Sequence, residues 1–95
     1  VSGTMGLAED GQEPDSLEAQ LDLSWANIAR ILREADMTVA NIVRVTSYLR
    51  DAAYAPKNQA ARITALGARR VPTTAIVVET LQEDWKVEVE VIAAV

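Results

Sequence analysis

The first candidate for chemistry is a carboxylate in an apolar stretch near the end of the chain. Glu88 lies in residues 87–91, where valine and glutamate alternate. A carboxylate that is buried without a partner has a raised pKa and can act as a general base toward water. The same alternation also describes the polar face of a half-exposed strand, whose glutamates do no chemistry. The residue types alone therefore leave Glu88 between a catalytic and a structural role.

Composition excludes several kinds of catalytic centre. The chain has no histidine and no cysteine, so catalytic triads built on these residues are excluded, as are zinc sites and thiolate nucleophiles. We expect neither a metal nor a cofactor. Asn58 is a second polar candidate, although an asparagine near a helix start equally forms local hydrogen bonds.

Charge and hydropathy limit the partners. The net charge is -5, and the small cluster of Arg62, Arg69 and Arg70 is too little for a nucleic-acid footprint. No apolar run is long enough for a membrane span, and no export signal is visible. We therefore expect no nucleic-acid partner, no membrane partner and a cytoplasmic location.

Two helices are predicted by caps and apolar spacing. Asp15 or Ser16 is expected to cap the first helix, which should end near Ala35, with Asp36 in the left-handed conformation. Pro56 suits the first turn of the second helix, and Gly67 should end it after Leu66.

The remaining segments have the composition of strands. Residues 1–7 read as the end of a strand, and residues 42–50 alternate so that Val43, Val45, Ser47 and Leu49 share one face. Residues 71–81 and 85–95 predict two strands that residues 82–84 join as an antiparallel hairpin. The fold class is therefore α+β, with a sheet covered by two helices on one face. Its other face stays partly apolar, which favours association of copies in closed cyclic symmetry.

The order and spacing of these segments resemble the RidA/YjgF family of imine and enamine deaminases, over essentially the whole chain. The matching segments are residues 1–3, 25–32, 42–51, 55–58 and 86–90, with the strand ending at Leu81. The resemblance implies a chorismate mutase-like fold, a homotrimer with an inner barrel, and small-molecule sites at the subunit interfaces. We therefore expect a single domain, residues 1–95. Compared with the family, we expect this domain to lack the N-terminal strand or strands.

The resemblance carries site residues over position by position. Glu88 corresponds to the glutamate that helps to activate water, while Gly3 and Asn58 correspond to ligand-orienting groups. The substrate-binding arginine is absent, and its place is taken by Thr73 or, with a shift of one residue, by Thr74. Arg69 and Arg70 either reach back into that cleft or lie solvated at the end of the second helix. Tyr48 is an additional candidate for a cleft wall.

A threonine cannot replace the bidentate contact between a guanidinium and a carboxylate, which contributes about 1.5 to 3 kcal/mol. We therefore expect a protein that hydrolyses an imine or enamine without the usual carboxylate, and not a standard 2-aminoacrylate deaminase. The alternative is a non-catalytic trimer that binds a metabolite or a partner.

Overall fold

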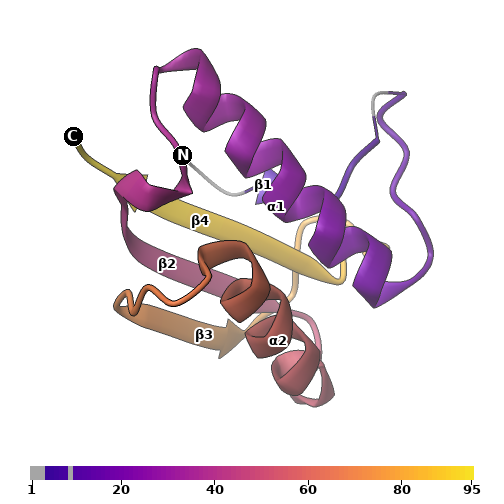
Figure 1. Ribbon diagram of the computed structural model, residues 1–95. Coiled ribbons are helices and arrows are strands. Elements are labelled where there is room, and N and C mark those ends of the chain that lie inside the picture. The colour runs from indigo at the N-terminus through magenta and orange to yellow at the C-terminus, as the bar shows by residue number, and fades with distance from the viewer. Residues whose placement is uncertain (1–3, 9) are drawn as a thin grey trace.

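Two helices cover one face of a four-stranded sheet in the computed structural model, which describes residues 4–8 and 10–95 (Figure 1). The elements follow the expected α+β pattern. They are β1 (Thr4–Met5), α1 (Leu17–Glu34), the 3-10 helix η1 (Val39–Asn41), β2 (Ile42–Leu49), the 3-10 helix η2 (Ala52–Tyr54), α2 (Ala55–Leu66), β3 (Thr73–Val77) and β4 (Val87–Ala93). Within these described ranges no helix has the length and apolarity that a bilayer crossing requires.

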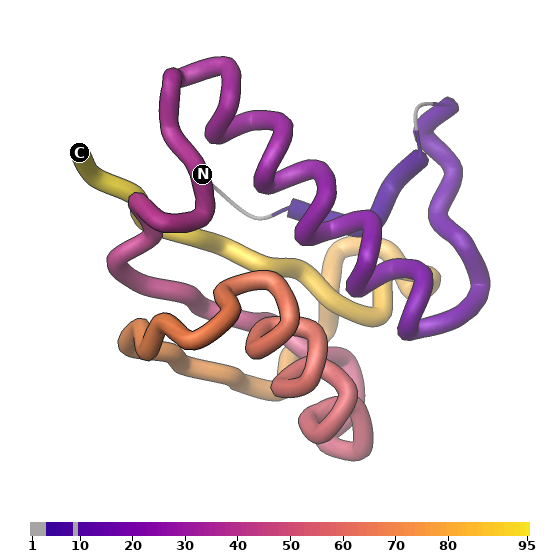
Figure 2. Tube along the Cα trace, in the orientation of Figure 1, coloured from indigo at the N-terminus to yellow at the C-terminus, as the bar shows by residue number. Residues whose placement is uncertain are grey.

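The strand order is β1-β4-β2-β3, and it corrects one prediction. β3 and β4 do not form a hairpin, because β2 lies between them and pairs parallel with β3 and antiparallel with β4. Residues 78–86 carry the chain from the end of β3 past β2 to the start of β4 (Figure 2). The hydroxyl of Thr80 helps to close this connection by bonding to the carbonyls of Gln82 and Trp85.

Burial explains why β4 takes an inner position. Val87, Val89 and Val91 are buried and point toward the helices. A strand with such a row of β-branched side chains is stabilised most when both of its edges are paired and one of its faces is covered. β3 is the edge strand instead, and most of its side chains are exposed.

The helix boundaries match the caps read from the sequence. The side chain of Ser16 accepts a hydrogen bond from the amide of Ala19 at 3.1 Å, and Asp36 has a φ of 57° after the last turn of α1. Gly67 ends α2 with a φ of 65°. Side chains on one side of α1 build most of the core, together with β2 and β4: Leu17, Leu21, Trp25, Ile28 and Leu32.

An irregularity at the start of β2 changes which residue enters this core. The register shifts between Ile42 and Arg44, so Ile42 is fully buried while Val43 is 46% exposed. Strict alternation had placed Val43 on one face with Val45, Ser47 and Leu49, and those three residues are buried. A β-bulge inserts one unpaired residue and reverses the facing of the side chains before it, which explains the error.

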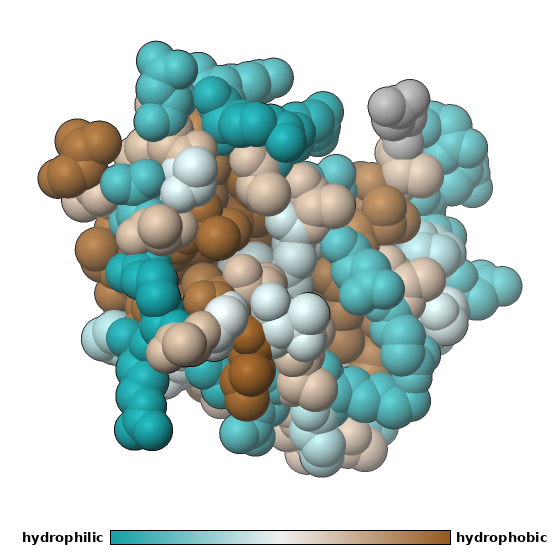
Figure 3. All heavy atoms as spheres, viewed as in Figure 1, coloured by the Kyte–Doolittle hydropathy of each residue, from teal (hydrophilic) through white to brown (hydrophobic). Residues whose placement is uncertain are grey.

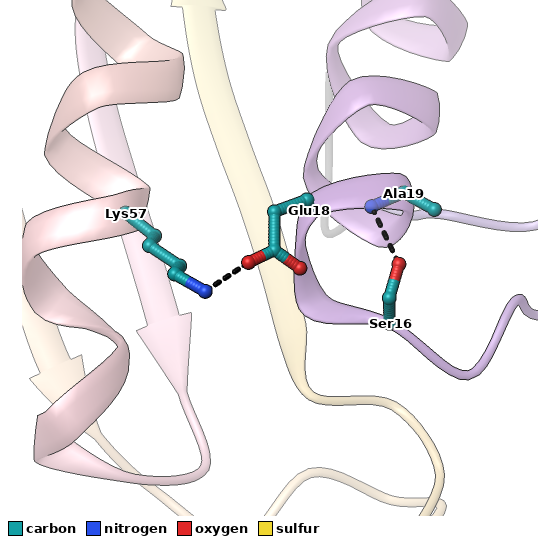
Figure 4. A network of polar contacts seen from close by, with 4 residues as sticks. All are labelled: Ser16, Glu18, Ala19 and Lys57. Carbon is teal, nitrogen blue, oxygen red and sulfur yellow. Dashed lines mark hydrogen bonds and ion pairs between the residues drawn. The ribbon is translucent and has the colours of Figure 1, made fainter.

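The two helices meet near their N-terminal ends. Glu18 in the first turn of α1 forms an ion pair with Lys57 of α2, next to the Ser16 cap (Figure 4). The hydrogen bond from Lys57 lowers the pKa of Glu18. Both side chains are more than half exposed, so the pair adds little to stability. Apolar atoms remain visible between the two helices (Figure 3).

Gln20 of α1 connects the loop before its own helix to the distant segment that leads into β4. Its side-chain amide donates to the carbonyls of Pro14 at 2.8 Å and Asp84 at 2.9 Å, and its side-chain oxygen accepts from the amide of Lys86 at 2.9 Å. The residue is 1% exposed. A buried polar side chain with these three partners fixes the loop that delivers β4 to the sheet.

Replacing Gln20 with methionine is expected to lower the free energy of unfolding by about 3 kcal/mol, because three hydrogen bonds from a buried side chain to backbone groups are lost while the side-chain volume is kept. In a domain of this size the melting midpoint should fall by on the order of 15 °C. Thermal and urea unfolding would measure both. The exposed Gln82→Met is the matched control, and a loss below about 1 kcal/mol for Gln20→Met would contradict this role.

Candidate functional site

The sheet has a covered face under the helices and an open face. Side chains of β2 and β4 that alternate with the buried ones belong to the open face, and the cross-strand register arranges them in rows. One row runs Met5, Glu88, Tyr48 and Ile76 across the four strands. The next row contains Glu90, Thr46 and Thr74, and a third pairs Ile92 with Arg44.

Glu88 lies on this open face, half-buried, and directly opposite Tyr48. The hydroxyl of Tyr48 donates to a carboxylate oxygen of Glu90 at 3.4 Å. Partial burial, together with the negative charges of Glu90 and Glu88, raises the pKa of Tyr48. Tyr48 therefore stays protonated and acts as a hydrogen-bond donor beside two carboxylates at neutral pH.

The two threonine candidates lie on different faces of β3. Thr74 pairs with Thr46 on the open face, where its hydroxyl accepts a hydrogen bond from Nη2 of Arg44 at 2.5 Å. Thr73 pairs with Val45 and so belongs to the face on which the helices lie. Thr73 is nevertheless exposed, because β3 is an edge strand, and its hydroxyl donates to the carbonyl of Val71.

Asn58 lies on α2 and is therefore on the helix side of the sheet. It is 3% exposed, and its side-chain oxygen has no hydrogen-bond partner among the described residues. A buried amide oxygen without a donor is costly, and a ligand or a second chain that supplies a donor would remove that cost. Its surroundings do not match a residue that merely caps the start of α2, where the structure has no side-chain cap bond.

The candidate residues thus form two groups. Glu88 and Thr74 share the open face, with Tyr48 and Arg44 beside them, whereas Asn58 and Thr73 lie on the helix side. Gly3 lies outside the described residues, so its part stays a prediction. Arg44 was not among the candidates, although its alternation with Tyr48 already placed it on the polar face of residues 42–50.

Arg69 takes up a position that neither earlier interpretation described. Its guanidinium donates to the carbonyls of Val39 and Ile42 at 2.9 and 3.1 Å, so it is held at the start of β2.

Over residues 4–8 and 10–95 no group of three potential metal ligands gathers.

Comparisons with known proteins place this geometry in context. The family model described as endoribonuclease L-PSP matches residues 1–95. A member of the highly conserved YjgF/YER057c/UK114 family from Mycobacterium tuberculosis is 27% identical, with a TM-score of 0.89 over 100% of this chain and 76% of that one.

Two further solved structures share the fold at lower identity. RidA from the Antarctic bacterium Psychrobacter sp. PAMC 21119 is 22% identical, with a TM-score of 0.94 over 100% of this chain and 78% of that one. Yeast Mmf1 is 23% identical, with a TM-score of 0.90 over 98% of this chain and 75% of that one. No curated protein matches the chain.

Proposed function

Because this chain belongs to the endoribonuclease L-PSP family, whose structures include RidA and YjgF proteins, we propose that it binds a small molecule between copies of itself and hydrolyses it. The ligand would be an imine or enamine without a carboxylate. The site would combine Glu88 of one copy with Asn58 and Thr73 of the next in a homotrimer. A cytoplasmic location, without a nucleic-acid or membrane partner, is part of the same proposal.

One observation carries the proposal: Glu88 and Asn58 lie on opposite sides of the same sheet. A site that uses both groups cannot form within one chain and needs a second copy to bring the two faces together. The open face offers apolar surface for such a contact. Ile76 and Ile92 on this face are 43% and 54% exposed, and they lie beside the polar row of Glu90, Thr46 and Thr74.

The proposed reaction needs no metal or cofactor. Glu88 would accept a proton from water as the water oxygen bonds to the imine carbon, and would pass that proton to the imine nitrogen, which takes up the electron pair of the double bond. In the resulting carbinolamine the hydroxyl proton would move through Glu88 to the nitrogen as the carbon–nitrogen bond breaks, which releases ammonia and a carbonyl compound. The protonated donor Tyr48 lies next to Glu88 and would hold the attacking water or the leaving nitrogen.

The substrate class follows from Thr73. Its hydroxyl supplies at most one neutral hydrogen bond, whereas a guanidinium holds a carboxylate by two charge-assisted bonds. We therefore expect the protein to hydrolyse propan-1-imine and to leave 2-iminobutyrate, which is the same imine with a carboxylate, at its spontaneous rate. Both imines can be generated by oxidation of the amine and followed by semicarbazide trapping.

Light scattering is the control for assembly, and we expect a mass three times the 10.3 kDa of one chain. Hydrolysis of 2-iminobutyrate alone would contradict the proposed substrate class. A trimer that hydrolyses neither imine, yet binds small molecules, would favour the alternative of a non-catalytic binding protein. The observation that favours this alternative is that a threonine stands where the family's substrate-binding arginine is expected.

A further inference from the structure

A hollow lies between the C-terminal half of α2 and the segment that leads into β3. Its volume is about 480 Å³, which suits a small metabolite. In the space-filling view, hydrophilic side chains gather over this segment (Figure 3). The hollow is separate from Glu88, which is on the open face. The lining residues are Gln59, Arg62, Ile63, Gly67, Ala68, Arg69, Arg70 and Val71.

The charge of this lining is opposite to that of the protein. The chain carries 14 acidic and 9 basic residues, yet three arginines and no carboxylate line the hollow. The described residues contain a single ion pair, Lys57 with Glu18, so none of the three arginines is neutralised by a side chain there. Three uncompensated cations around one concave surface attract anions more strongly than scattered charges do.

The hydrogen bonding of two of these arginines suits a binding site. The guanidinium of Arg69 is held by the carbonyls of Val39 and Ile42, so its charge is fixed in place before any ligand arrives. The Nε of Arg62 is buried and has no hydrogen-bond partner among the described residues. A buried donor of a charged group without an acceptor is unfavourable, and an oxyanion would supply that acceptor.

Helix electrostatics do not account for this arrangement. Cations after a helix C-terminus can complement its dipole by binding the last carbonyls. The guanidinium of Arg69 instead binds carbonyls of η1 and of the start of β2, and the last turn of α2 contains no basic residue. We propose that this hollow is a binding site for the oxyanion group, phosphate or carboxylate, of a small metabolite, with Arg62, Arg69 and Arg70 as its ligands.

Titration of the protein with inorganic phosphate and, separately, with acetate tests the proposal, with amide chemical shifts as the readout. We expect saturable shifts that are largest at Gly67 and Ala68. Arg62→Gln should weaken binding about tenfold or more, as the loss of a charge-assisted hydrogen bond predicts. Arg30→Gln, an exposed cation on α1 away from the hollow, is the matched control and should bind as the wild type does.

Arg70→Gln provides a second variant at an exposed position, in case Arg62→Gln does not fold. The relative affinity for phosphate and acetate tells which oxyanion the site prefers. Chemical shifts that do not saturate would overturn the proposal. So would a loss of affinity in Arg30→Gln that equals the loss of affinity in Arg62→Gln. Tighter, Arg62-dependent binding of a short single-stranded RNA than of phosphate would assign the hollow to nucleic acid instead.

Discussion

Glu88→Gln is expected to reduce imine hydrolysis at least about 100-fold, because the amide keeps the shape of the side chain but cannot accept a proton from water. The Asn58→Ala variant should also lose most of its activity, since the substitution removes the amide that the proposed site takes from the helix side of the next copy. Hydrolysis of propan-1-imine by each purified variant would measure these losses, with circular dichroism to verify folding.

Mixing the two variants gives the sharpest form of this test. In trimers refolded from equal amounts of Glu88→Gln and Asn58→Ala, about a quarter of the interfaces should combine an intact Glu88 from one copy with an intact Asn58 from the next. Activity should therefore return to about a quarter of the wild-type level. No recovery in mixed trimers would show that the active groups do not come from different copies, and would contradict the proposed site.

Thr73→Arg is expected to raise the rate of 2-iminobutyrate hydrolysis by on the order of 10- to 100-fold, because it adds a bidentate anchor worth about 1.5 to 3 kcal/mol for the substrate carboxylate. Thr73 is exposed on the helix side of the edge strand, so the longer side chain has room. The value of kcat/KM for both variant and wild type would measure the gain.

Thr74→Arg is the matched control, one residue away and on the other face. It would replace the hydroxyl that accepts from Arg44 and place two guanidiniums together, so we expect no gain and a less stable protein. A gain in Thr74→Arg alone would show that the site lies on the open face. A wild type that is already active on 2-iminobutyrate would show that the missing arginine does not matter for this protein.

Short-range signals determined much of this structure from the sequence. Capping and termination predicted both helices to within a residue or two, including the Ser16 cap, Asp36 and Gly67. The order of the segments also identified the family. The caps and helix ends depend on neighbours within a few residues along the chain, so the sequence contains the information for them directly.

The tertiary structure decided what depends on partners far away in the chain. The parallel pairing of β2 with β3 replaced the predicted hairpin, because central strands are chosen by burial on the whole sheet and not by the length of a connection. The same pairing decided that Thr74 belongs to the open face and Thr73 to the helix side, and the position of α2 separated Asn58 from Glu88. Alternation fixes only that two adjacent residues of a strand face opposite ways, and the choice of face comes from the packing of the helices.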